Sequence, residues 1–179
     1  MAKKLQEAQQ VEASYLAALR AYSDAIYAGL IAARSGGAAG GAGGDALLLD
    51  KTPAYALSLD FLARLYPGAR YIVLTRHPLA VWSSYVDSFF DGDDRVAHAH
   101  NPLLERYVPA IGRFLRETPV ALHRVRYEEL VRDPEGHAQA LADFLGLDFE
   151  SGMVDYGSVA DAQRESTRGL GDPMTVARE

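Results

Sequence analysis

The stretch from Leu47 to Tyr85, LLLDKTPAYALSLDFLARLYPGARYIVLTRHPLAVWSSY, decides the fold. It contains two short apolar runs, Leu47–Leu49 and Tyr71–Thr75, and each is followed by polar residues that include a cation. Between the runs, leucine and phenylalanine recur at helical spacing, and Pro67-Gly68 closes the predicted helix. A strand, a helix and a strand in so few residues predict a right-handed βαβ unit with parallel strands.

Two cations, Lys51 and Arg76, follow the two predicted strands. Ligands of open parallel sheets bind beyond the carboxyl ends of the strands, so we expect both cations to face one crevice and an anion. The guanidinium fork of Arg76 suits phosphate oxygens, and the helix that starts at Pro78 would add N–H groups, with the hydroxyl of Ser84 nearby. From these residues alone, a phosphate-type ligand and a structural ion pair are equally good interpretations.

Composition limits the class of protein. The chain has 179 residues, of which 49% are apolar, and this suits one domain with a real core. Its net charge of −6 argues against general binding to nucleic acid or anionic membranes. The absence of cysteine excludes disulfides and thiol catalysis. There is no apolar run near the ~20 residues of a membrane span and no signal-peptide core, so we expect a cytoplasmic protein.

We expect a single domain over residues 1–179 with an α/β core at 45–146. Residues 1–34 are predicted to form an amphipathic helix, and 147–179 an irregular, truncated segment. Residues 35–44, SGGAAGGAGG, are predicted to be a flexible linker, because a phosphate loop ends in Gly-Lys-Ser/Thr and leads into a helix. The apolar face expected on the first helix consists of Val11, Tyr15, Leu19, Tyr22, Ile26 and Leu30.

The helix that starts at Pro78 leads into a polar connection over residues 89–102. Its own apolar face is predicted to consist of Val81, Trp82, Tyr85 and Phe89. The connection carries the pair His98 and His100, which lacks a third metal ligand at a set spacing. A solvated loop is therefore the preferred interpretation, and a lid over a substrate is the alternative.

Two helices and one strand complete the predicted core. A helix begins at Pro102, and Pro109 should kink or break it. Val120–Val125 is predicted to be a third strand. The last helix should be capped by Asp133, which a proline follows, and should end at Gly146.

Several motifs, taken in order, carry a family resemblance. They are Asp50–Tyr55 (DKTPAY), Tyr66–Leu74 (YPGARYIVL), Arg76–Pro78 (RHP), Val125–Leu130 (VRYEEL) and Gly169–Pro173 (GLGDP). Together they resemble the core of bacterial sulfotransferases that use 3′-phosphoadenosine-5′-phosphosulfate (PAPS).

The resemblance implies a fold, a reaction and site residues. The fold would be of the P-loop-NTPase-like α/β type, a three-layer arrangement with helices on both faces of a parallel sheet. The reaction would transfer a sulfuryl group from PAPS to a hydroxyl or amine acceptor, a small molecule or peptide, without a metal. Lys51 would stabilise charge at the sulfuryl group as its bond breaks. The cofactor contacts would come from Arg76 and Ser84 at the 3′-phosphate, Arg168 and Gly169 in the loop over it, and Tyr127 at the adenine, although Tyr127 also fits a structural role.

The sequence departs from this family before residue 50. A first strand with a loop similar to Pro-Arg-Ser-Gly-Thr-Thr has no counterpart there, nor does the glutamate base that follows it in many members. Pro53 occupies the position at which other members place a histidine base, so the remaining candidates are His77, His98 and His100.

We therefore expect a fragment or degenerate sulfotransferase with impaired activity, which self-associates or has a partner that completes the sheet. Two alternatives stay open. One is a non-catalytic remnant that binds PAP, the desulfated product of PAPS. The other is a structural or interaction module.

Overall fold

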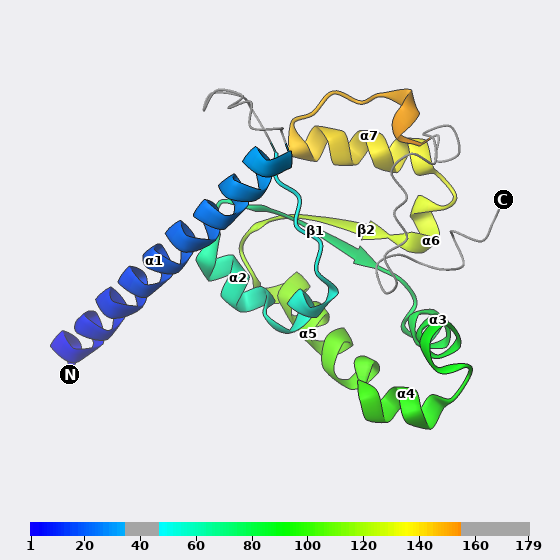
Figure 1. Ribbon diagram of the computed structural model, residues 1–179, viewed down its shortest axis with the longest axis horizontal. Helices are drawn as coiled ribbons and strands as arrows, with labels where there is room; N and C mark the ends of the chain where they lie inside the picture. Colours follow the sequence, from blue (N-terminus) through cyan, green and yellow to red (C-terminus); the bar gives the residue numbers. More distant parts are fainter. Residues whose placement is uncertain (35–46, 155–179) are drawn as a thin grey trace. The chain divides into compact units, whose positions relative to one another are not determined.

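The computed structural model describes residues 1–34 and 47–154 (Figure 1). The chain divides into two compact units. The first unit contains Met1–Ala69 and Arg113–Thr118. The second contains Arg70–Gly112 and the described residues from Pro119 onward. The predicted linker at 35–44 and most of the predicted C-terminal segment lie outside the described residues.

Two helices, α1 (Ala2–Arg34) and α2 (Leu59–Leu65), form most of the first unit. The 3-10 helix η1 (Pro53–Leu57) precedes α2 and begins at a proline, whose missing N–H would be unpaired in a first turn anyway. Leu65 of α2 and Phe114, from the Arg113–Thr118 stretch, are buried.

Polar side chains take part in the packing of α1 within the first unit. Nε of Arg20 donates to the carbonyl of Leu65 at 2.6 Å, and the hydroxyl of Tyr66 donates to Asp24 at 2.8 Å. The helix itself was predicted, but most of its predicted apolar face is exposed, because the seven-residue α2 is too short to cover it, and Leu19 is half-buried. Five side chains of the predicted apolar face are 45–70% exposed: Val11, Tyr15, Tyr22, Ile26 and Leu30.

The second unit is built on a two-stranded parallel sheet of β1 (Arg70–Thr75) and β2 (Ala121–Arg126). Arg70 lies opposite Ala121 and Thr75 opposite Arg126, so both strands end at the same edge. The strands predicted at Tyr71–Thr75 and Val120–Val125 are confirmed to within one residue at each end. Val73 and Val125 provide their buried side chains.

The strand predicted at Leu47–Leu49 is absent. These residues belong to the first unit, have no regular secondary structure, and are 48–79% exposed. An extended segment becomes a strand only when a neighbouring strand takes up its N–H and C=O groups, and no strand in the described ranges pairs with this one. The predicted βαβ unit is therefore wrong in its first strand. The parallel pair consists instead of β1 and β2.

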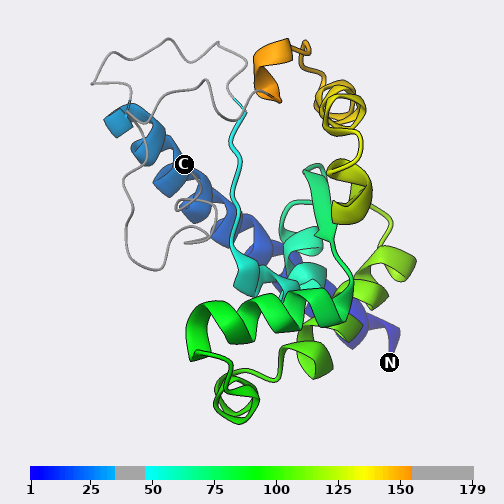
Figure 2. The same cartoon turned by 90° about the vertical axis from the view of Figure 1, so that its right-hand side faces the viewer.

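Three helices lie between β1 and β2 in the sequence, and two follow β2. They are α3 (Pro78–Phe90), α4 (Asp94–His100), α5 (Leu103–Glu117), α6 (Tyr127–Leu130) and α7 (Pro134–Leu145), after which comes the 3-10 helix η2 (Ser151–Met153). α3 and α4 lie side by side (Figures 1 and 2). α6 and α7 contact β2 and each other. The architecture is thus mixed α/β with a small parallel sheet, and helices on both faces of a larger sheet stay a prediction.

The polar connection predicted at 89–102 contains a helix, α4. The Asp93 carboxylate caps it by accepting from the N–H groups of Arg95 and Val96 at 2.9 and 3.0 Å, and Ala97 is fully buried. The loop prediction was wrong because the capping role of Asp93 is not evident in the sequence beside the neighbouring Asp91 and Asp94. On α3, the predicted packing residue Phe89 is 60% exposed, while Val86 is buried.

Two further helix predictions had opposite outcomes. α5 continues through Pro109, so a break there was wrong. Proline removes one hydrogen bond to the carbonyl four residues earlier, here that of the exposed Glu105, which water can satisfy. The ends predicted for α7 are confirmed: Asp133 accepts from the N–H of Gly136, and Gly146 ends the helix with φ 70°.

Candidate anion-binding site

A pocket lies at the edge of the sheet where β1 and β2 both end. Its volume is about 300 Å³, and it belongs entirely to the second unit. The residues that line it are Thr75, Arg76, His77, Pro78, Arg124, Arg126 and Glu128. With three guanidinium groups against one carboxylate, the lining is net positive, as binding of a phosphate or sulfate group requires.

Arg76 is the first residue after β1, and its guanidinium stacks on an aromatic ring. Its Cζ lies 4.6 Å from the ring centroid of Tyr127, which begins α6 directly after β2. This cation–π contact restrains the position of the guanidinium, whose N–H groups can still donate to a ligand. Register explains the contact, because Thr75 and Arg126 are paired, and so the next residue of each chain segment also lies close.

Arg124 and Arg126 were missed by the sequence interpretation. Nε of Arg124 donates to Oγ1 of Thr75 at 3.3 Å, and Arg126 pairs with Glu129 at 3.1 Å. The signal was available, because residues two apart in a strand share a face, and both arginines occur at the end of a predicted strand. The sequence interpretation assigned the anion site to the ends of the first two predicted strands, and therefore it did not include the end of the third.

Glu128 holds the turn between β1 and α3. Its carboxylate accepts from the backbone N–H of His77 at 2.7 Å. That hydrogen bond lowers the pKa of Glu128, to which the nearby Arg126 and Arg76 charges also contribute. The carboxylate is therefore ionised near neutral pH, and it fixes the backbone immediately after Arg76.

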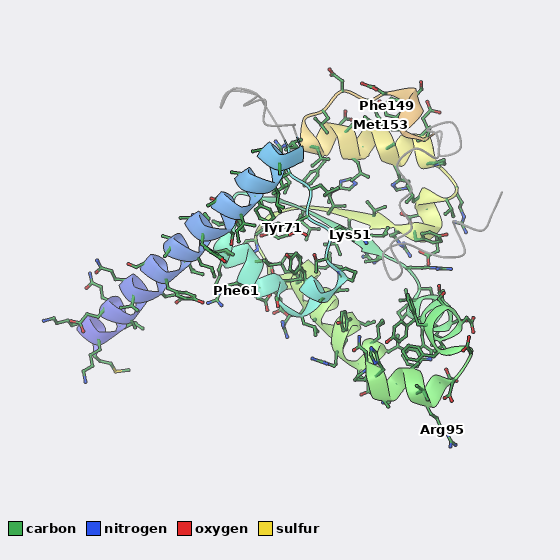
Figure 3. All side chains as sticks on the ribbon, in the orientation of Figure 1. Lys51, Phe61, Tyr71, Arg95, Phe149 and Met153 are labelled. Atoms are coloured by element: carbon green, nitrogen blue, oxygen red, sulfur yellow. The ribbon has the colours of Figure 1, made fainter. Side chains whose placement is uncertain are left out.

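Lys51 belongs to the first unit and lies in the segment that leads into η1 (Figure 3). Its side chain is exposed. Arg76 belongs to the second unit, so the predicted convergence of the two cations stays a prediction.

The remaining predicted site residues are distributed as follows. Ser84 is exposed on α3 and is not among the residues that line the pocket, so its role stays a prediction. Arg168 and Gly169 lie outside the described residues. His77 lines the pocket, whereas His98 and His100 lie on α4, beside Trp82 and Phe90 respectively.

Neither a metal-ligand cluster nor a membrane-spanning helix occurs among the described residues. Within 1–34 and 47–154, no three histidine, aspartate or glutamate side chains are grouped as a metal site would need. In the same ranges, none of the helices has the length and apolar character to cross a membrane.

Comparison with known proteins gives consistent matches. A sequence profile described as the sulfotransferase family matches residues 2–151. Omega-hydroxy-beta-dihydromenaquinone-9 sulfotransferase Stf3 of Mycobacterium tuberculosis is 31% identical over 115 residues, which are 56% of this chain and 29% of Stf3. Nodulation protein NoeE of Sinorhizobium fredii is 29% identical over 153 residues, 72% of this chain and 33% of NoeE.

A solved structure, the sulfotransferase domain from the curacin biosynthetic pathway, is 32% identical with a TM-score of 0.48. The match covers 60% of this chain and 41% of that domain. The chain thus spans about a third of the length of Stf3 and of NoeE.

Proposed function

The chain belongs to the sulfotransferase family, and from that premise we propose that it serves the transfer of a sulfuryl group from PAPS to an acceptor hydroxyl or amine. The observation that supports this most is the pocket with three arginines at the carboxyl edge of the parallel strands. Open α/β sheets bind ligands at this edge, and guanidinium groups match phosphate oxygens in pairs.

The pocket would hold the 3′-phosphate of PAPS. Arg76 would make a two-point contact through the N–H groups that its stacking on Tyr127 leaves available. Ser84, Arg168 and Gly169 would add contacts to the same phosphate, as the family resemblance implies. In this arrangement Tyr127 supports Arg76, which adds to the two roles considered for it from the sequence.

The reaction would be an in-line displacement at sulfur. A bond forms between sulfur and the acceptor oxygen or nitrogen while the bond from sulfur to the bridging oxygen of PAPS breaks, and PAP leaves. The ammonium of Lys51 would stabilise the negative charge that develops on that oxygen. The acceptor also loses a proton to a base. His77, His98 and His100 are the histidine candidates for that base, and His77 lines the pocket proposed for the 3′-phosphate rather than a site at the sulfuryl group. No metal takes part.

The acceptor is proposed to be a small molecule or a peptide. The name of Stf3 specifies an omega-hydroxy compound, and this relationship favours a hydroxyl acceptor for the present chain. We propose a cytoplasmic location, with which the absence of cysteine from the sequence agrees.

The test is calorimetric titration with PAP and with AMP, which differ only in the 3′-phosphate. The chain should bind PAP more tightly than AMP. Because a hydrogen bond to a charged group contributes roughly 1.5–3 kcal/mol, Arg76→Ala should weaken PAP binding at least about tenfold. Arg95→Ala, a change of the same type on α4, is the matched control. Equal affinity for PAP and AMP in the unmodified chain would contradict the proposal.

A non-catalytic PAP-binding protein is the second candidate, and the location of the pocket within one unit favours it. Labelled PAPS with a panel of phenol, alcohol and amine acceptors separates the two. If the unmodified chain transfers the sulfuryl group and the Lys51→Ala variant does not, the chain is a sulfotransferase enzyme. Selective PAP binding without transfer supports the remnant. If the chain does not bind PAP at all, the structural or interaction module is the hypothesis that stays.

A further inference from the structure

Three hydroxyl groups converge on the carboxylate of Asp50, the residue directly before Lys51. Tyr27 from α1 and Tyr55 from η1 donate to Oδ2, at 2.5 and 2.8 Å. Thr52 donates to Oδ1 at 3.1 Å. The three donors come from α1, from η1 and from the residue directly before η1, and all belong to the first unit. Together they fix the exposed side chain of Asp50. We call these four residues the Asp50 clamp.

The protonation states make the clamp persistent at neutral pH. The hydrogen bond from Tyr27 lowers the pKa of Asp50 below its ordinary value of 3.8, and the hydroxyls of Tyr55 and Thr52 act in the same direction. In turn, the hydrogen bond to Asp50 raises the pKa of Tyr27, so this phenol stays protonated and continues to donate.

These properties make Asp50 unsuitable as the proton acceptor of the reaction. A general base works best with a pKa near the operating pH and with a free lone pair directed at the acceptor proton. Asp50 has a depressed pKa, and both of its oxygens already accept hydrogen bonds. Its contribution must come from what it holds in place.

What it holds is the backbone at Lys51. Consecutive Cα atoms are 3.8 Å apart, so fixing Asp50 fixes the origin of the Lys51 side chain. The preceding Leu47–Leu49 segment has no regular secondary structure and cannot provide this restraint through a sheet. On the other side, the N–H of Tyr55 donates to the carbonyl of Thr52 at 3.0 Å, which begins η1.

We infer that the Asp50 clamp positions Lys51 for the transfer step, an assignment that rests on the proposed function. A lysine ammonium on a four-carbon stem is mobile, and it acts on a developing charge only if its backbone is fixed. Asp50 is therefore a positioning residue, and Tyr27 carries this role into α1.

The test begins with a measurement that needs no turnover, the {1H}–15N NOE of the Lys51 amide in the full chain. Tyr27→Phe and Asp50→Asn should each lower this NOE while the values for α2 stay unchanged. Tyr22→Phe removes a hydroxyl from an exposed position of the same helix and should change nothing. An unchanged NOE at Lys51 in Asp50→Asn would overturn the inference. If that variant does not fold, Tyr27→Phe, which lacks a single hydroxyl, decides.

The second measurement is steady-state transfer from PAPS. Asp50→Asn should lower kcat at least about tenfold with little change in KM for PAPS, because small misplacements of a catalytic group are costly. If transfer requires Lys51 but kcat is unchanged in Asp50→Asn, the role of the Asp50 clamp is refuted and the proposed function is retained. Absence of any transfer would refute the proposed function, while the NOE still decides whether the clamp orders Lys51.

Discussion

Replacing Tyr127 by leucine should weaken PAP binding, although the proposed contact with the phosphate belongs to Arg76. The guanidinium carbon lies 4.6 Å from the ring centroid, within the range of a cation–π contact. At an exposed site such a contact is worth about 0.5–1 kcal/mol, which corresponds to roughly two- to fivefold in the dissociation constant. Tyr127→Phe keeps the ring and should bind PAP as the unmodified chain does.

The assay is calorimetry with PAP and AMP on four proteins: the unmodified chain, Tyr127→Leu, Arg76→Ala and the double variant. If Tyr127 acts by supporting Arg76, its loss affects PAP and spares AMP. The Tyr127→Leu substitution should then have little effect on PAP affinity in the Arg76→Ala protein, because Arg76→Ala has already removed the interaction that the two residues share. Urea unfolding of each protein verifies that the fold is retained.

Two results would refute this reasoning. An equal loss of affinity for PAP and AMP on Tyr127→Leu would mean that the ring contacts the nucleoside, the role that the family resemblance implies. Additive effects of the two substitutions on PAP affinity would mean that the observed stacking does not organise the pocket.

Three further predictions concern stability and pH. Phe114→Ala should lower the free energy of unfolding by about 3–5 kcal/mol, since Phe114 is fully buried; Leu79→Ala, at a position 62% exposed, should change it by less than about 0.5 kcal/mol in the same urea titration. Gly146→Ala should cost about 1–2 kcal/mol because φ is 70° there, whereas Gly152→Ala, which meets open space, should leave the melting temperature unchanged. The depressed pKa of Glu128 means that its hydrogen bond stabilises the fold above the ordinary value of 4.5 and is lost as the pH falls through the lower folded value. NMR titration of the amide that donates to it should show this loss, and Glu128→Gln should abolish the titration.

Local signals predicted the elements whose stability is local. A capping aspartate and a terminal glycine fixed both ends of α7, Asp133 and Gly146, because each acts on a backbone within a few residues. The strands β1 and β2 were also predicted, since each carries its own apolar residues. The strand at Leu47–Leu49 was not correctly predicted, because a strand depends on a partner that the local sequence does not specify.

The same distinction applies to the candidate site. The sequence alone predicted that Arg76 would lie at a strand end, since that follows from the strand itself. The stacking of Arg76 on Tyr127 could not be predicted, because it requires the register in which Thr75 faces Arg126. The Asp50 clamp was missed for a related reason: Tyr27 comes from a helix separated from Asp50 by a glycine-rich stretch, and only the folded unit brings the two together.

The parallel pairing has a consequence for the order of folding. Arg70 pairs with Ala121 and Thr75 with Arg126, so about fifty residues must be looped back before the first ladder hydrogen bond can form. Loop closure of that length costs about 3.5 kcal/mol beyond a constant term, and the sheet recovers this only through its own contacts and those of its helices. The intervening helices therefore gain structure first, and the strands align late. Because the pocket needs both strand ends in register, we expect it to be among the last features of the second unit to assemble.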